Sequence, residues 1–173
     1  MSGRRTIGIL TISTMGAAGQ REDTSGEAIR EMVAAEPLAG DVAERALVPD
    51  DREAIEAILR SWADERHLDL ILTTGGTGLS PTDLTPEATR AVLDREAPGI
   101  AEAMRAESLR HTPMGMLSRA VAGLRGPTLI INLPGSPKGV RECLAAIMPA
   151  LPHAVDIASA RQTGHSPGAS RQG

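Results

Sequence analysis

Short apolar runs alternate with longer amphipathic segments along most of this 173-residue chain. An apolar run bounded by turn residues is typical of a buried strand, whereas apolar residues at positions i, i+3, i+4 and i+7 indicate a helix. Ile55, Ile58, Leu59 and Trp62 have that helical spacing. The apolar runs predict strands at residues 7–12, 42–48, 69–74 and 128–133.

Strands that alternate with helices imply a mostly parallel sheet with helices on both faces. We therefore expect a three-layer α/β/α fold in one domain over residues 1–160. Residues 161–173 carry no apolar pattern that could pack, so a disordered tail is expected there. Further helices are predicted from about residue 25, over 85–94, over 99–110 and from about 140 to 157, with Pro149 and Pro152 breaking the last one.

Polar segments follow directly after the predicted strands, beginning at Ser13, Asp50, Gly75 and Asn132. In open parallel sheets, ligands bind beyond the carboxyl ends of the strands, where the strand order reverses. Segments that are far apart in the sequence would therefore meet at one edge of the sheet. This convergence predicts a single composite site.

The most informative segment follows the third predicted strand. Gly75, Gly76 and Gly78 allow a sharp turn and let backbone amides point at an anion. Thr85-Pro86 is then expected to cap and begin a helix. The segment lacks the Gly-Lys-Ser/Thr ending of a P-loop, and Pro81 replaces the third glycine of the dinucleotide fingerprint. An ordinary tight connection between strand and helix is the alternative interpretation.

Two aspartates are candidates for holding a cation at this edge. Asp83 lies two residues before the expected cap and has no evident structural task, and its carboxylate would repel phosphate unless a cation lay between them. Mg²⁺ is commonly held by one or two carboxylates together with substrate phosphates. Asp50 and Glu53 have the spacing of a capping box, so capping is the simpler role of Asp50, yet it follows a strand and would lie near Asp83. Asp51 is expected to be a solvated acid of the first helical turn.

The segment from Asn132 to Lys138 offers a second place for an anion. It contains two prolines around Gly135-Ser136 and then begins a helix, whose N-terminus attracts anions. Lys138 is the single lysine among 18 basic residues. Ser118-Arg119 offers a hydroxyl and a cation. A rigid turn and an exposed turn are the alternative explanations of these two segments.

Composition excludes several classes of function. The chain has one Trp and neither Phe nor Tyr, so it lacks aromatic platforms for single-stranded nucleic acid. A net charge of -4 without a basic cluster argues against binding to a duplex. No apolar run approaches the ~20 residues of a membrane span, and no signal peptide is evident, so a cytoplasmic protein is expected. Cys143, the single cysteine, is expected to be a partly buried helix residue.

At residues 74–78 (Thr-Gly-Gly-Thr-Gly) and 83–88 (Asp-Leu-Thr-Pro-Glu-Ala), the chain resembles the molybdopterin adenylyltransferase family of molybdenum cofactor biosynthesis, MogA/MoaB type. It is also similar to the G domains of gephyrin-like proteins. The resemblance covers about residues 5–158 and includes Leu-Ser-Arg at 117–119 and Asn-Leu-Pro-Gly at 132–135. It implies a homotrimer with the MogA/MoaB-like molybdopterin-binding fold that uses Mg-ATP to adenylylate molybdopterin and releases pyrophosphate.

The resemblance also implies the roles of individual residues. Asp50 and Asp83 are the acidic, catalytic pair that holds Mg²⁺ at the nucleotide. Many members have Asp at position 14, where this chain has Thr14, so no role is expected for that residue. The residues expected to bind phosphate, pterin or nucleotide are Ser13, Gly75, Gly76, Thr77, Gly78, Thr85, Ser108, Ser118, Asn132, Pro134, Gly135, Ser136 and Lys138.

Two other functions are compatible with the same residues. The chain could be a non-catalytic molybdopterin-binding or scaffolding protein of the pathway, although the presence of both aspartates favours the enzyme. It could also resemble the related domain of competence-associated nucleotide hydrolases, but the chain is too short for their second catalytic domain. In either pathway role, the pterin would pass to a molybdenum-insertion protein.

Overall fold

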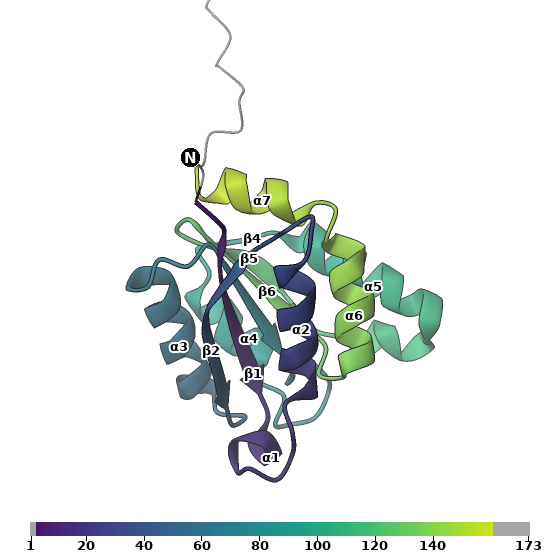
Figure 1. Cartoon of the computed structure of the whole chain (residues 1–173). Coiled ribbons are helices and arrows are strands. Elements are labelled where there is room, and N and C mark those ends of the chain that lie inside the picture. Colours follow the sequence, from purple (N-terminus) through teal and green to yellow (C-terminus); the bar gives the residue numbers. More distant parts are fainter. Residues whose placement is uncertain (1–2, 161–173) are drawn as a thin grey trace, which may run out of the picture.

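The computed structural model describes residues 3–160, which form a six-stranded sheet in the order β2-β1-β3-β6-β5-β4 (Figure 1). Strands β2, β1, β3 and β6 are parallel, and β5 and β4 extend the sheet in antiparallel pairing. The strands are β1 (Thr6–Ile12), β2 (Asp41–Val48), β3 (Leu70–Thr74), β4 (Arg95–Glu96), β5 (Ala122–Arg125) and β6 (Thr128–Leu133).

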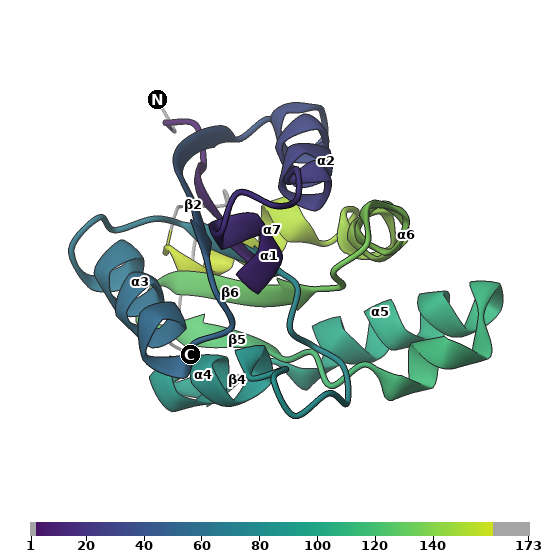
Figure 2. The same ribbon diagram turned by 90° about the horizontal axis from the view of Figure 1, so that it is seen from below.

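Helices cover both faces of the sheet, so the predicted three-layer architecture is confirmed. Viewed from below, α2 and α6 lie on one side of the sheet, and α3 and α4 lie on the other (Figure 2). The helices are α1 (Thr14–Ala17), α2 (Thr24–Ala34), α3 (Arg52–Asp64), α4 (Thr85–Val92), α5 (Pro98–His111), α6 (Pro137–Ile147) and α7 (Leu151–Ala158), with a 3-10 helix, η1, at Pro113–Leu117.

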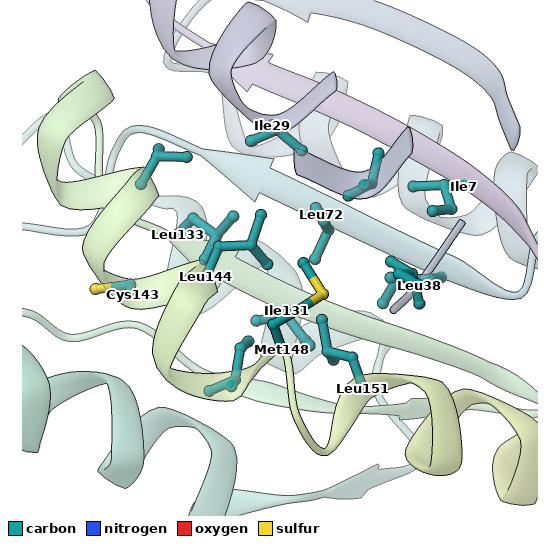
Figure 3. Close-up of a cluster of buried hydrophobic side chains, with 14 of the residues drawn as sticks. Ile7, Ile29, Leu38, Leu72, Ile131, Leu133, Cys143, Leu144, Met148 and Leu151 are labelled. Carbon is teal, nitrogen blue, oxygen red and sulfur yellow. The ribbon is translucent and has the colours of Figure 1, made fainter. Parts of the chain in front are cut away.

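The core is aliphatic and is divided by the sheet into two clusters. Successive side chains of a strand point to opposite faces, so neighbours in β3 belong to different clusters. Leu70 and Leu72 pack with α2, α6 and α7, whereas Ile71 packs with α3 and α4. Figure 3 shows part of the first cluster, in which Leu72 and Ile131 of the sheet face Leu144 and Met148. This two-sided burial explains why the parallel strands are apolar runs without alternation.

All four predicted strands are confirmed, and the predicted break near Pro149 separates α6 from α7. The prediction missed four elements. It treated residues after Ser13 as a loop, where the short helix α1 forms, and it did not find β4, η1 or β5. The disordered tail expected at 161–173 lies outside the described residues. None of the helices in the described part of the chain is long and apolar enough to cross a membrane.

The order of the strands fixes the position of the site. After β1 the chain adds β2 on one side and then returns to place β3 on the other, so the strand order reverses between β1 and β3. At such a point the loops that follow the two neighbouring strands run to opposite faces of the sheet, and a crevice opens between them at the carboxyl ends of the strands. The loop after β1 contains α1, which lies at this edge in Figure 1.

Candidate active site

A pocket of about 730 Å³ lies at the carboxyl ends of the parallel strands. We call it the strand-end pocket. Its walls come from the loops that follow β1, β2, β3 and β6, as the sequence predicted. A cavity of this size is within the range of small-molecule sites. The predicted residues that line it are Ser13, Asp50, Gly75, Gly76, Asp83, Gly135 and Ser136.

The glycine turn after β3 adopts backbone conformations that other residues avoid. Gly75 has φ +99° and Gly76 has φ +69°. A Cβ atom at Gly75 would lie 2.2 Å from the carbonyl oxygen of Ile12, and one at Gly76 would lie 2.3 Å from Thr85 Oγ1. Only glycine therefore allows the turn to pass this close to β1 and α4.

Thr85 holds the turn and is not the helix cap that the sequence suggested. The N-cap of α4 is Leu84, which makes no side-chain capping bond, and Thr85 is the first helical residue. The Thr85 hydroxyl donates to the Gly75 carbonyl oxygen at 2.9 Å, and its backbone N–H donates to the Gly76 carbonyl oxygen. Because this side chain is fully buried, these bonds fix the turn on the start of α4.

Arg119 clamps the other half of the same loop. Its guanidinium donates to the carbonyl oxygens of Gly78 at 2.8 Å and Asp83 at 2.7 Å, and it forms an ion pair with Glu87 of α4. The hydrogen bond from Arg119 holds the pKa of the Glu87 carboxyl below its usual range. A planar guanidinium with several donors suits this role, because one side chain then ties the turn, the loop and the helix together.

Asp83 has a structural task that the sequence did not reveal. Its Oδ2 accepts from the Ser80 backbone N–H at 3.0 Å and closes the loop between the glycine turn and α4. A Cβ atom at Gly78 would lie 2.9 Å from the same oxygen, so the carboxylate lies against the turn. Asp83 also lines the strand-end pocket. The structural bond therefore orients the carboxylate and does not remove it from the pocket.

Asp50 is not the cap of α3, and the capping interpretation of this residue was wrong. Asp51 is the cap, and its carboxylate accepts from the Ala54 backbone N–H at 2.9 Å, so it is not merely a solvated acid.

Asp50 instead binds Thr14 and lines the strand-end pocket. Its Oδ1 would lie 3.4 Å from a Cβ atom at Gly76. Asp50 thus flanks Gly76 and Asp83 flanks Gly78, which brings both carboxylates to the same glycine turn.

A second pocket of about 310 Å³ opens on the other side of the turn. We call it the loop pocket. Ser136 lines both pockets, and its hydroxyl caps α6 by accepting from the Gly139 N–H at 3.0 Å. Lys138 is the second residue of α6, as the sequence suggested, and its ammonium is exposed. The predicted residues that line the loop pocket are Thr77, Gly78, Ser108, Ser118, Pro134, Ser136 and Lys138.

Two predicted binding residues line neither of these two pockets, Thr85, which holds the glycine turn, and Asn132. Asn132 is fully buried, and its amide donates to Thr73 and Thr89 and accepts from the Val121 N–H. It connects β6 to β3, α4 and the segment before β5, so its role is to support the edge of the sheet. Cys143, expected to be a partly buried helix residue, lies in α6 and is buried beside Ser108, and burial raises the pKa of its thiol.

Sequence reasoning missed the charged and polar groups that the loop after β1 brings to the strand-end pocket. Thr14, Arg21 and Glu22 all line it. Arg21 is the single basic residue among the residues that line this pocket, against the acids Glu22, Asp23, Asp50 and Asp83. Asp23 is paired with Arg45, but neither Asp50 nor Asp83 has a salt bridge within residues 3–160. The residues that line the pocket therefore carry an excess of negative charge beside the glycine turn.

Comparisons with known proteins agree with this geometry. Residues 8–153 match the family described as "Probable molybdopterin binding domain". The chain is 46% identical over 151 residues to a molybdopterin adenylyltransferase of Helicobacter pylori strain J99, covering 87% of this chain and 86% of the relative. The identity to the molybdopterin adenylyltransferase of Escherichia coli K12 is 41%, covering 82% of this chain and 72% of the relative.

A solved structure supports the same grouping. The molybdopterin biosynthesis enzyme MoaB from Thermus thermophilus superposes with a TM-score of 0.86 at 57% identity and covers 91% of this chain and 98% of that chain. The fold, the glycine turn with its two flanking aspartates and these likenesses lead to one conclusion. The chain belongs to the molybdopterin-binding family that includes the molybdopterin adenylyltransferases.

Proposed function

We propose that this protein catalyses the transfer of an adenylyl group from ATP to molybdopterin in molybdenum cofactor biosynthesis. An oxygen of the terminal phosphate of molybdopterin attacks the α-phosphorus of ATP. A new phosphorus–oxygen bond forms, the bond from the α-phosphorus to the oxygen that bridges to the β-phosphorus breaks, and pyrophosphate leaves. Adenylyl-molybdopterin is the product.

The observation that carries this proposal is the position of Asp50 and Asp83 at the two ends of one glycine turn. Within residues 3–160, no group of three or more His, Cys, Asp or Glu side chains is arranged to hold a metal by itself. Two carboxylates without a salt bridge fit Mg²⁺, which is commonly held by one or two carboxylates and the phosphates of a substrate. When bound, Mg²⁺ would neutralise the negative charge of the nucleotide phosphates.

The two pockets suit two substrates. The strand-end pocket contains both aspartates and the backbone amide of Gly76, so we assign the nucleotide to it. The loop pocket contains Lys138 and the exposed side chain of Met114, so we assign molybdopterin, with its phosphate, to it. The turn from Gly75 to Gly78 and Ser136 lie between the pockets, where the two phosphates would meet.

The chain's own residues act by alignment and charge stabilisation. Phosphoryl-type transfers need positioning and electrostatic support more than a protein nucleophile. The backbone amides of Gly76, Thr77 and Gly78 would bind phosphate oxygens, and the bonds from Thr85 and Arg119 keep the turn rigid. Cys143 is buried and stays outside this scheme.

The remaining parts of the proposal concern assembly and context. We propose a homotrimer, as the family resemblance implies, and a hand-over of the adenylylated pterin to a molybdenum-insertion protein. Since the reaction consumes ATP, the proposed setting is the cytoplasm.

The test is incubation of the purified protein with molybdopterin, ATP and Mg²⁺, followed by mass detection of adenylyl-molybdopterin. We expect product only when all three are present. A protein that binds molybdopterin but gives neither product nor calorimetric heat with Mg-ATP would be a pterin carrier, and the enzymatic proposal would be wrong.

A further inference from the structure

Thr14, for which the sequence suggested no role, makes three hydrogen bonds with one catalytic candidate. Its hydroxyl donates to Asp50 Oδ2 at 2.8 Å, and its backbone N–H donates to the same oxygen at 3.2 Å. The hydroxyl oxygen also accepts from the Asp50 backbone N–H at 3.1 Å. The Thr14 hydroxyl thus both donates a hydrogen bond to Asp50 and accepts one from it, although the two residues are 36 positions apart in the sequence. The loop after β1 and the loop after β2 are joined at this point.

These bonds leave the two oxygens of Asp50 in different situations. Oδ2 has two donors from Thr14, whereas Oδ1 has no donor among residues 3–160 and faces Gly76. An aspartate side chain that makes no hydrogen bond can rotate among several rotamers. The Thr14 hydroxyl removes that freedom and keeps Oδ1 directed at the glycine turn. The fixed oxygen is on the side where the proposed nucleotide and cation would lie.

We propose that Thr14 is a positioning residue that holds Asp50 ready to bind the cation of the Mg-nucleotide. This inference rests on the proposed function. The hydroxyl is the essential group, because it provides two of the three bonds. Thr14 is exposed, so a change of its side chain leaves the apolar core intact. Ligand-orienting partners of this kind typically change metal affinity or activity by about 10- to 100-fold when they are removed.

The chain contains a matched control at the other end of β1. Thr6 donates to Asp69 Oδ2 from its backbone N–H at 2.8 Å and its hydroxyl at 3.1 Å, and accepts from the Asp69 N–H at 3.1 Å. The bonding pattern is the same as that of Thr14 and Asp50, but this pair lies at the amino ends of β1 and β3, opposite to the glycine turn, and lines neither pocket.

The experiment compares Thr14→Val, Thr14→Ser and Thr6→Val with the wild type. For each protein, calorimetry gives the Mg²⁺ concentration for half-maximal ATP binding, and turnover gives kcat and the KM for molybdopterin. Thermal unfolding measures stability. We expect Thr14→Val to raise the Mg²⁺ requirement about 10- to 100-fold without changing the KM for molybdopterin. Thr14→Ser should stay close to the wild type. Thr6→Val should lower the Tm and leave the Mg²⁺ requirement unchanged.

Each alternative outcome decides against a specific statement. If Thr14→Val binds Mg-ATP like the wild type, or if Thr14→Ser fails as badly as Thr14→Val, the positioning role is wrong while the proposed function stands. If the wild type binds Mg-ATP but forms no product, the enzymatic proposal is wrong. The positioning role is then judged from binding alone. A wild type that binds no Mg-ATP overturns both.

Discussion

The two ends of strand β1 carry the same threonine–aspartate bonding pattern in different surroundings. At the amino end, Thr6 binds Asp69, which is only 8% exposed and precedes β3. At the carboxyl end, Thr14 binds Asp50, which lines a pocket of about 730 Å³ beside the glycine turn. The two sets of bonds join the same groups and have similar lengths, 2.8–3.1 Å and 2.8–3.2 Å, so they cannot account for a difference in function.

The difference comes from what lies next to each aspartate. Asp69 is buried, and its bonds join the start of β3 to the start of β1. Asp50 keeps one oxygen without a protein donor in the part of the chain that the structure describes, and that oxygen faces Gly76. The same local chemistry therefore serves stability at one edge of the sheet and a reaction at the other. Three experiments test this contrast.

The largest expected effect is on turnover. Asp50→Ala and Asp83→Ala should each reduce turnover on the order of 100- to 1000-fold, because the Mg²⁺ that would stabilise the charge of the transferring phosphate loses one of its carboxylate ligands. Asp69→Ala should instead lower the free energy of unfolding by about 1–3 kcal/mol, since a partly buried N–H loses its acceptor. Mass-detected product formation and thermal unfolding measure the two effects. A fully active Asp83→Ala protein would contradict the assignment.

A smaller effect is expected from alanine in place of glycine at the two edges. Gly76→Ala forces φ +69° on a residue with a Cβ atom and brings that atom to 2.3 Å from Thr85 Oγ1. We expect a loss of turnover. We also expect the free energy of unfolding to fall by more than the ~1–2 kcal/mol that a left-handed backbone conformation costs. Gly126→Ala is the control, because Gly126 has φ +51° with open space around it.

Gly126 lies in the turn between β5 and β6, away from the carboxyl ends of the parallel strands. Gly126→Ala should lower the free energy of unfolding only by the cost of the backbone strain, and it should leave turnover unchanged. Chemical denaturation and the product assay separate the two variants. Equal losses of turnover for both would mean that general destabilisation, and not the geometry of the turn, limits activity.

The smallest effect concerns the pH dependence of stability. Arg119 lowers the pKa of Glu87 by hydrogen bonding, so the pair stabilises the fold fully above the ordinary glutamate pKa of about 4.3. That contribution is lost as the pH falls through the lowered value. Glu87→Gln should therefore lower the free energy of unfolding by about 0.2–1 kcal/mol at neutral pH. The difference in stability from the wild type should vanish in acid.

A matched ion pair exists away from the site. Arg125 binds Asp64 at 2.6 Å and lowers the pKa of that carboxyl in the same way. Asp64→Asn should change stability with the same pH profile and leave turnover unaffected, whereas Glu87→Gln should also slow turnover because the clamp on the Asp83 loop weakens. Urea unfolding between neutral and acidic pH is the measurement. A pH-independent difference for Glu87→Gln would contradict the role of the ion pair.

The main features of the fold were predictable because they depend on the order of residues. Apolar runs and helical spacing located the four parallel strands, and the polar segments after them indicated the edge where the site lies. β5 and β4 were not predictable in this way. Arg95–Glu96 has no apolar pattern, and it becomes a strand only because it pairs with Leu124 and Gly123.

Individual roles at the site were less predictable, because they depend on backbone angles and on distant partners. Both Asp50 and Asp51 precede a helix, but only Asp51 places its oxygen on the Ala54 N–H. Thr85 resembled a cap by sequence, but its hydroxyl turns back to Gly75.

By itself, the sequence determined the layered fold, the glycine turn, the two aspartates and the edge at which they meet, because periodicity and residue type carry that information. Only the tertiary structure decided that Thr14 holds Asp50, that Arg119 clamps the turn and that Asn132 is buried. These contacts join residues that are 11 to 59 positions apart. No local pattern records them, since they exist only once the sheet has brought its loops together.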